Sequence, residues 1–297
     1  MHDHDLGLSH DLRVMTALAS RRRALGLFAG VGTGAVLAGC DGGSSSTATS
    51  ATATPTPTPT ATATATPTPT PTATATTTSC VADPAETNGP YPADGTNTSS
   101  GLTSNALTAS NVVRSDIRSS FIGTSTTVAS GVQLTLTLTL VDVNSSCGAL
   151  AGYAIYVWHC DEAGKYSLYS LPAESYLRGV GVTDSNGQVT FTTIFPGCYS
   201  GRWPHIHFEV FSSLSNATSG RYAVLTSQLA MPSAACSAVY NGVSGYSASI
   251  ANFAAVSINS DTVFGDNTAA QVAQQTPTLS GSVTGGYTGT AVIGIAR

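Results

Sequence analysis

The segment from residue 199 to residue 210, Tyr-Ser-Gly-Arg-Trp-Pro-His-Ile-His-Phe-Glu-Val, constrains the fold of this chain more than any other. Its second half alternates with the period of a β-strand, so its side chains point to two opposite faces. One face carries the apolar side chains Ile206, Phe208 and Val210, and the other carries His205, His207 and Glu209. Two imidazoles two positions apart lie roughly 6.5 to 7 Å apart at Cα, so both can bind one metal ion at about 2 Å. The segment therefore predicts half of a metal site.

Other segments also have the pattern of strands. Residues 133–143 alternate Thr and Leu with near-perfect period two, and residues 154–160 are a short apolar run rich in β-branched and aromatic side chains. Further strands are predicted at 177–182, 189–194, 205–211, 222–229 and 288–295, with turn residues between them. No segment shows a convincing helical stripe. We therefore expect residues 80–297 to form one all-β domain, a β-sandwich.

The N-terminal residues 1–40 are interpreted as an export signal rather than as part of the fold. Residues 20–25, Ser-Arg-Arg-Arg-Ala-Leu, are similar to the twin-arginine export signal, and an apolar stretch follows at 24–38. Residues 37–40, Leu-Ala-Gly-Cys, resemble a bacterial lipobox with Cys40 as the lipidated residue. The alternative is a transmembrane anchor, but the apolar stretch is shorter than the ~20 residues that a span needs. We expect an exported protein, either a cell-envelope lipoprotein or a secreted one.

Residues 41–79 form a low-complexity segment of Ser followed by Thr-Pro and Thr-Ala repeats. No side chain in it is both apolar and larger than Ala, so it cannot bury enough surface to offset its ordering entropy. The Thr-Pro runs favour an extended polyproline II conformation. We interpret the segment as a disordered, semi-rigid stalk, and a Pro-rich partner-binding ligand is the alternative.

Charge and cysteine content narrow the function classes. After Cys40 the chain has seven basic and thirteen acidic residues, a net charge of −6, with Lys165 as its single lysine. This composition argues against nucleic-acid binding, which needs a cationic face. Five cysteines follow Cys40, and in an exported protein they are expected to pair, although an odd number leaves at least one free. They are Cys80, Cys147, Cys160, Cys198 and Cys236.

Several motifs occur in an order that resembles the intradiol ring-cleavage dioxygenases, and the secreted branch of that family in particular. The resemblance begins near Glu86, includes an early Gly89-Pro90-Tyr91, and continues to the C-terminus. Its main motifs are Trp158-His159-Cys160-Asp161, Gly164-Lys165-Tyr166-Ser167, Leu177-Arg178-Gly179, Tyr199, Gly201-Arg202 and His205-Ile206-His207. Two tyrosines and a His-x-His in this order are specific, whereas any one of the motifs alone is weak.

The resemblance implies a non-haem Fe(III) held by four side chains, Tyr166, Tyr199, His205 and His207. Tyr199 and His207 would be the axial pair, with Tyr166 and His205 in the equatorial plane. Tyrosinates are hard anionic donors that stabilise ferric over ferrous iron. The iron must lower the pKa of both tyrosines well below about 10 for them to bind as anions at neutral pH.

The resemblance also implies a reaction and roles for three residues. A catechol-type substrate would be cleaved with O2 between its two hydroxylated carbons, which gives a cis,cis-muconate-type diacid. Tyr199 would leave the iron and take a substrate proton, and Arg202 would bind substrate and stabilise negative charge on the ring. Tyr91 matches a pocket-lining tyrosine. His159 is common in the family pattern but is expected to be structural.

The sequence departs from the classical enzymes in two places. Tyr199 and His205 are only six positions apart, and the helical dimerisation region of the catechol branch has no counterpart. Both differences suggest a more open pocket, and they leave the substrate and the oligomeric state undetermined.

Three other functions and one other set of metal ligands are alternatives to the ferric enzyme. The scaffold also resembles non-catalytic transthyretin-like binding modules. A zinc hydrolase would use His205 and His207 and would need Glu209 as a third ligand or as a base. A serine hydrolase is weaker, because no Gly-x-Ser-x-Gly turn accompanies a histidine. Cys160 and Cys198 could instead be soft metal ligands.

Overall fold

The computed structural model describes residues 81–99 and 102–297 of the chain, and these residues fall in one compact unit. The predicted export signal (1–40), with its lipidation residue Cys40, and the predicted stalk (41–79) lie outside the described residues. The predicted mainly β fold is confirmed for the described part of the chain, since most of its regular structure is strand.

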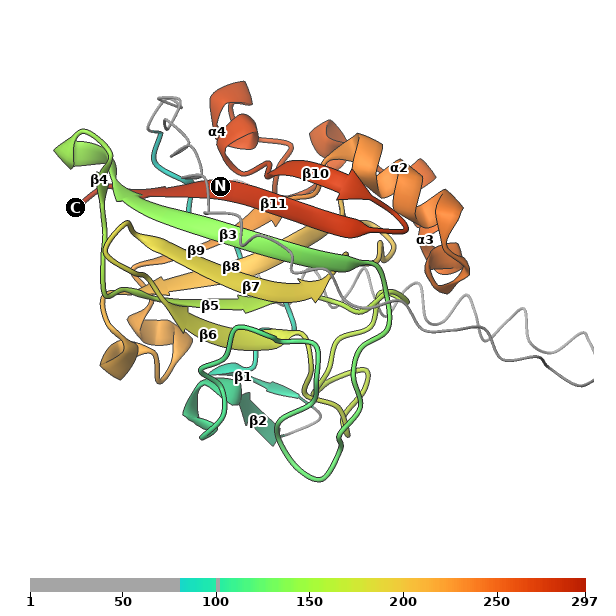
Figure 1. Cartoon of the computed structure of the whole chain (residues 1–297), viewed down its shortest axis with the longest axis horizontal. Coiled ribbons are helices and arrows are strands. Elements are labelled where there is room, and N and C mark those ends of the chain that lie inside the picture. Colours follow the sequence, from blue (N-terminus) through green and yellow to red (C-terminus); the bar gives the residue numbers. More distant parts are fainter. Residues whose placement is uncertain (1–80, 100–101) are drawn as a thin grey trace, which may run out of the picture. The chain divides into compact units, whose positions relative to one another are not determined.

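The first of two larger sheets has β3 at its centre (Figure 1). On one side, β3 pairs in parallel with β11, which pairs with the edge strand β10. On its other side, β3 pairs with β7 along most of its length and with the short β4 at its end. The bounds are β3 (Gln133–Asp142), β4 (Gly148–Ala149), β7 (Gln188–Ile194), β10 (Thr278–Ser282) and β11 (Gly286–Ile295).

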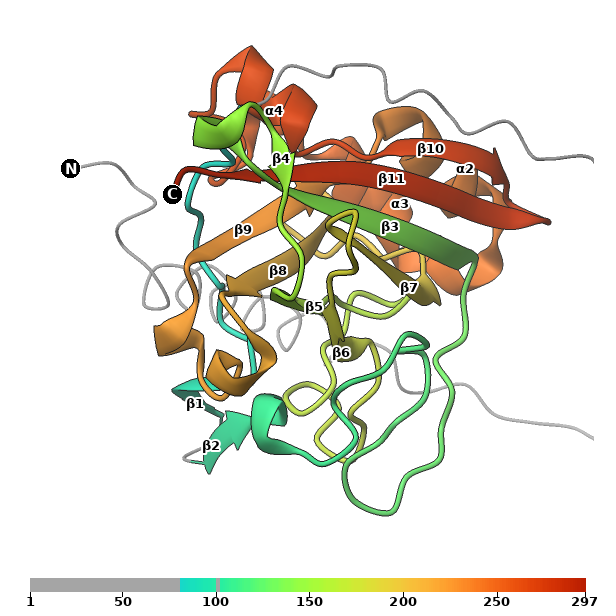
Figure 2. The same ribbon diagram turned by 60° about the vertical axis from the view of Figure 1, so that its left-hand side comes forward.

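The second sheet is antiparallel throughout and has the order β6-β5-β8-β9. Its strands are β5 (Ala154–Trp158), β6 (Arg178–Val182), β8 (His205–Phe211) and β9 (Leu225–Ala230). A separate two-stranded ribbon, β1 (Asp94–Ser99) and β2 (Leu102–Asn105), lies on the far side of this sheet from β3 and β11 (Figures 1 and 2).

One hydrophobic core fills the space between the two larger sheets. The Leu residues of the Thr-Leu alternation in β3 are fully buried in it, and they meet the alternate apolar residues of β5, β7 and β8. The apolar face of β8 predicted from the sequence, Ile206, Phe208 and Val210, belongs to this core. The other face of β8 therefore points away from the core, toward the N-terminal segment and the loops that cover it.

The sequence predicts no helix in this domain, and this prediction is wrong. The chain forms α2 (Ser233–Gly242), α3 (Ser247–Ala254) and α4 (Ala269–Gln274), along with short 3-10 turns. The buried side of α2 combines Val239 and Tyr240 with the small Ala235 and Cys236, so its apolar stripe is weak in sequence although it packs on the core. None of the helices in the described part of the chain is long and apolar enough to cross a membrane.

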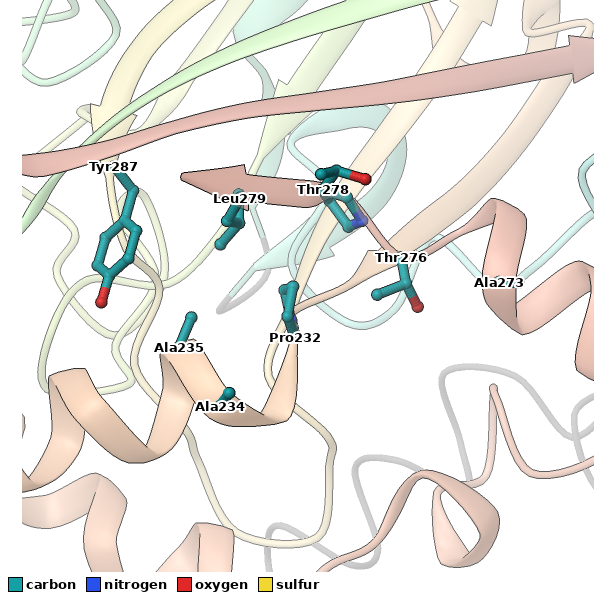
Figure 3. Close-up of a pocket in the computed structure, with 9 residues that line it drawn as sticks. Pro232, Ala234, Ala235, Ala273, Thr276, Thr278, Leu279 and Tyr287 are labelled. Carbon is teal, nitrogen blue, oxygen red and sulfur yellow. The ribbon is translucent and has the colours of Figure 1, made fainter. Parts of the chain in front are cut away.

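A cavity of about 700 Å³ lies where the start of α2 faces the end of α4 and β10 (Figure 3). Its lining is made of small and weakly polar side chains from these elements, with Leu279 and Tyr287 at one side. It contains no His, Cys, Asp or Glu. Because it offers neither a metal-binding set nor an acid–base pair, this cavity is not the candidate site.

The start of the described chain is fixed to the last strand through Asp83. Its backbone N–H donates to Gly294 O (2.9 Å), and Gly294 N donates back to its Oδ2 (2.7 Å). Burial raises the pKa of the Asp83 carboxyl to about 7, although the hydrogen bond from Gly294 lowers it in part. The folded protein therefore holds a proton on Asp83 at pH values where an unfolded chain has lost it.

We expect Asp83 to make the folded state less stable as the pH rises from about 4 to about 7, because the unfolded chain binds fewer protons in that window. The slope should reach up to about 1.4 kcal/mol per pH unit. Asp83→Asn keeps an acceptor for Gly294 but cannot titrate. In urea unfolding across this window, the free energy of unfolding of wild type should fall with rising pH relative to that of Asp83→Asn. Parallel curves for the two proteins would contradict the assignment.

Candidate metal centre

The four predicted metal ligands converge on one point at the start of β8. The Nε2 atoms of His205 and His207 are 3.1 Å apart, and the Tyr199 hydroxyl lies 3.1 Å from His205 Nε2. The Tyr166 hydroxyl lies 3.5 Å from the same nitrogen. Two ring nitrogens and two phenol oxygens thus surround a common centre, although Tyr166 and Tyr199 come from different loops.

The orientation of His205 is set by a backbone carbonyl. Its Nδ1 lies 2.5 Å from Trp203 O, and because a carbonyl only accepts, Nδ1 carries the proton. Its Nε2 then has a bare lone pair that faces the centre. A hydrogen bond from the second ring nitrogen is the usual way in which proteins orient a metal-binding histidine.

The orientation of His207 is set by packing rather than by a hydrogen bond. Trp158 is its direct neighbour across the β5–β8 pair, and the two rings stack at a centroid distance of 4.8 Å and an interplanar angle of 4°. On another side, a Cβ placed on Gly89 would lie 3.1 Å from His207 Cε1. Gly89 also has φ +68°, so a side chain there would be strained as well as crowded.

Burial controls the protonation of the centre. Burial, together with the positive charge of Arg202, lowers the pKa of His205 to about 3. Burial and the adjacent His205 lower the pKa of His207 well below its usual value, so both rings are neutral at physiological pH. Burial and then Tyr199 raise the pKa of Tyr166 well above its usual value. Without a cation the centre therefore holds neutral imidazoles and a neutral Tyr166 phenol.

The loop that carries Tyr166 is shaped by Asp161 and Gly164. Asp161 Oδ1 accepts the backbone N–H groups of Ala163 and Lys165, both at 2.9 Å. Gly164 has φ +75°, and a Cβ there would lie 3.2 Å from Tyr199 Cβ. The close approach of the two ligand-bearing loops therefore depends on a glycine directly before Lys165 and Tyr166.

The loop that carries Tyr199 is held by α3. Cys198 N donates to Ser249 Oγ, and Asn252 Nδ2 donates to Cys198 O, each at 2.8 Å. The Cys198 thiol is buried and donates to Arg202 O at 3.5 Å. A small residue before Tyr199 thus fits because a helix packs against this position, and this helix was not predicted.

Arg202 lies buried beside the histidines and is held by two residues far along the chain. Its Nε donates to Asp261 Oδ2 (2.9 Å) and its Nη2 donates to Gln228 Oε1 (2.7 Å). Burial by itself raises the pKa of Asp261, but the charge and hydrogen bonds of Arg202 bring it below its usual value. Asp261 also accepts the backbone N–H of Trp203 (2.6 Å), the residue whose carbonyl orients His205.

Asp261 and Gln228 are the residues that the sequence alone missed. A general signal existed for Asp261, because a buried arginine is often paired with a carboxylate and the chain has few acidic residues. Nothing in the sequence indicated that Asp261 was this partner.

The structure also places the other two residues singled out in the sequence, Tyr91 and His159. The Tyr91 ring is half-buried, 5.0 Å from the ring of Tyr166. His159 is buried, and its ring nitrogens lie 2.8 Å from Cys160 O and 2.7 Å from Thr193 Oγ1. Because both of its nitrogens are engaged outside the centre, His159 agrees with a structural role.

The expected pairing of the cysteines is wrong for three of them. Cys160, Cys198 and Cys236 are free and buried, whereas Cys147 is disulfide-bonded. Burial raises the pKa of the Cys160 thiol well above its usual value, and this thiol donates to Gly197 O at 3.4 Å. The thiols of Cys160 and Cys198 thus lie against backbone carbonyls, which leaves the soft-ligand alternative without support.

Glu209 is engaged away from the centre. Burial, and then the neighbouring Asp94, raise the pKa of Glu209 well above its usual value, and the two carboxyl groups hydrogen-bond. Within residues 81–99 and 102–297, no group of three or more His, Cys, Asp and Glu side chains is arranged to hold a metal ion. A zinc site built on His205, His207 and Glu209 therefore has no support from the geometry, and the donors that do converge on the two histidines are the phenols of Tyr166 and Tyr199.

A family match covers the segment that carries these donors. The model of a family described as Dioxygenase matches residues 114–232, which include Tyr166, Tyr199, Arg202, His205 and His207. No curated protein sequence matches the chain.

Solved structures share the fold. An intradiol ring-cleavage dioxygenase from Tetranychus urticae is similar with a TM-score of 0.50 and 24% identity over 63% of this chain and 87% of that chain. A second dioxygenase crystal structure gives a TM-score of 0.50 and 25% identity with the same coverage. The dioxygenase domain of a carbohydrate-binding fusion protein from Streptomyces sp. SirexAA-E gives 0.43 and 20%, over 73% of this chain and 99% of that chain. The resemblance to the intradiol ring-cleavage dioxygenases predicted from the sequence is confirmed.

Because the Arg202–Asp261 pair is buried, we expect the loss of Asp261 to destabilise the protein strongly. Asp261→Ala leaves a buried guanidinium without its carboxylate, so we expect a loss of about 3 to 5 kcal/mol in the free energy of unfolding. The matched control is Asp116→Ala, which breaks the exposed Arg118–Asp116 pair and should cost no more than about 1 kcal/mol. Urea denaturation measures both, and equal losses would contradict the role of the buried pair.

Proposed function

We propose that this protein is a non-haem Fe(III) intradiol dioxygenase that cleaves a catechol-type ring between its two hydroxylated carbons. Catechol and O2 would give a cis,cis-muconate-type diacid, with both oxygen atoms retained in the product. The family match and the likeness to dioxygenase structures support the enzyme class. The observation that carries the finer proposal is the convergence of two phenol oxygens and two Nε2 atoms on one buried point.

The donor set fits ferric iron. The two Nε2 atoms face each other at 3.1 Å, and the Nε2 of His205 is a bare lone pair because its Nδ1 donates to Trp203 O. A cation between the rings is the arrangement that satisfies such lone pairs, and phenolates add hard anionic donors that favour the ferric state. Tyr166, Tyr199, His205 and His207 would hold the ion, which when bound supplies Lewis acidity and an oxidising centre for a catecholate.

Tyr199 is the donor best suited to move a proton. It is half-buried, whereas Tyr166, His205 and His207 are each only 2% exposed. Its hydroxyl oxygen, as a phenolate, would take a proton from an incoming catechol hydroxyl. Tyr166 and the two histidines are fixed by packing and hydrogen bonds and would stay in place.

Arg202 is suited to stabilise negative charge on the substrate ring. Its guanidinium is buried, and Asp261 and Gln228 fix its position before substrate arrives. A charge fixed in advance in a dry environment stabilises developing charge without reorganisation. The Tyr91 ring, beside Tyr166, would form part of the wall against which the substrate ring packs.

A visible absorption spectrum of residues 80–297 after reconstitution with Fe(III) tests the proposal. We expect a broad tyrosinate-to-iron band that shifts when catechol is added without oxygen. A protein that stays colourless would favour the alternative, a non-catalytic transthyretin-like binding module. Metal analysis would then decide whether zinc occupies the histidines.

Tyr166→Phe should weaken and shift this band, because it removes one of the two anionic donors while keeping the ring. Tyr240→Phe is the matched control, since Tyr240 is also buried but its hydroxyl donates to Pro196 O, away from the centre. An unchanged band in Tyr166→Phe would exclude Tyr166 as a ligand. Loss of the band in both variants would point to a general loss of structure.

We further propose that the enzyme is exported, by the twin-arginine route, and tethered to a membrane through a lipid on Cys40. The support is the lipobox-like sequence 37–40 and the arginines at 21–23. Expression of the full chain should place wild type in the detergent-extractable membrane fraction and Cys40→Ser in the soluble exported fraction. If both proteins partition alike, Cys40 is not the anchor.

A further inference from the structure

Arg178 is a fully buried arginine at the start of β6 whose hydrogen-bonding capacity is completely used. A guanidinium has five N–H donors, and Arg178 makes five hydrogen bonds at 2.9 to 3.2 Å. The acceptors are the carbonyls of Tyr91, Pro92 and Ser167 and the hydroxyls of Ser167 and Tyr156. None of these five acceptors is a carboxylate, so the charge of Arg178 is directed entirely at backbone and hydroxyl oxygens.

Four of these five acceptors belong to the two segments that carry Tyr91 and Tyr166. Nη2 donates to Tyr91 O and to Ser167 O, both at 2.9 Å. Ser167 directly follows Tyr166, and Tyr91 is held through its own carbonyl. One nitrogen atom therefore connects the backbone of the wall residue to the backbone beside a proposed iron ligand.

The hydroxyl acceptors extend the same connection. Tyr156 accepts from Arg178 and donates to Pro92 O at 2.9 Å. Ser167 Oγ accepts from Arg178 and donates to Tyr176 O at 2.7 Å. Each hydroxyl thus has both a donor and an acceptor partner, so its orientation in the network around the guanidinium is fixed.

Tyr169 provides a second connection between the same segments. Ala93 N donates to its hydroxyl at 2.8 Å, and the hydroxyl donates to Asn97 Oδ1 at 2.9 Å. Its ring lies 5.0 Å from the Tyr91 ring, and the Arg178 guanidinium carbon lies 5.5 Å from the centre of the Tyr169 ring. Tyr91 is therefore packed between Tyr166 and Tyr169, both of which come from the loop after β5.

We propose that Arg178 is a positioning residue that sets the spacing between Tyr91 and Tyr166 and thereby the size of substituted catechol that fits beside the metal centre. This inference rests on the proposed function. A planar guanidinium can hold two backbone segments at fixed angles, whereas a lysine ammonium is a single point that cannot reach all five acceptors. A change at Arg178 should therefore loosen the wall and ligand loop together.

The test compares Arg178→Lys with Leu138→Ala, first as metal-free proteins and then after reconstitution with Fe(III). Leu138 is fully buried in β3 and belongs to the core between the sheets, so its truncation lowers stability without removing a contact of Arg178. Tyr169→Phe is a milder third variant, which removes one hydroxyl and serves if Arg178→Lys does not fold.

The first measurement is hydrogen exchange of the metal-free proteins. In Arg178→Lys, amides in residues 88–97 and 166–172 should exchange about tenfold faster relative to those of β3 and β11. Leu138→Ala should show no such local excess. This measurement needs neither iron nor activity, so it tests the connection even if the proposed function is wrong.

The second measurement is kcat and KM for catechol and for a catechol with a bulky 4-substituent. Arg178→Lys should change the ratio of the two kcat/KM values about tenfold, mainly through KM, since small misplacements of binding groups have large effects. Leu138→Ala should leave this ratio unchanged. If the ratio or the local exchange of Arg178→Lys matches Leu138→Ala, the inference is wrong, and if wild type turns over no catechol, the proposed function fails instead.

Discussion

Strand β8 is buried on both faces, and the rest of the structure follows from this. Its inner side chains join the core between the sheets, and its outer side chains include two histidines and a glutamate that need a polar environment away from water. Polar groups that are buried without partners are costly. The segments that cover this face therefore supply carbonyls, hydroxyls and phenols beside the polar groups, and apolar side chains such as Leu107 and Val112 elsewhere.

This arrangement separates two kinds of buried charge. Arg202 is neutralised by a carboxylate, whereas Arg178 is surrounded by backbone and hydroxyl oxygens. Between them, the histidines are kept neutral and ready to donate lone pairs. The centre thus offers nitrogen lone pairs without presenting any permanent negative charge of its own.

Sequence reasoning succeeded where side chains alternate strictly. The Thr-Leu run of β3 and the His-x-His segment of β8 were located almost to the residue, because each has one face in the core. It failed where small residues pack: α2 and α3, rich in Ala and Ser, gave no clear stripe, and β9 began three residues later than predicted.

The four donors of the candidate site were predictable from the sequence, but the residues that support them were not. The four donors were found because their spacing and order follow a family pattern, and the structure brings them together. Asp261 and Gln228 were missed because they contact Arg202 from 59 and 26 residues away, and only tertiary structure creates those contacts. The free state of Cys160, Cys198 and Cys236 likewise depends on how deeply each is enclosed.

The parallel pairing of β11 with β3 joins two strands that are separated by most of the domain in sequence. Until residues 286–295 have been synthesised, β3 has an unpaired edge along its whole length, and such edges can pair with other chains. Contacts between residues that are so far apart in the sequence also slow folding. Completion of the first sheet therefore waits for the whole domain, and the folding chain must keep this edge from pairing with other chains until its last strand arrives.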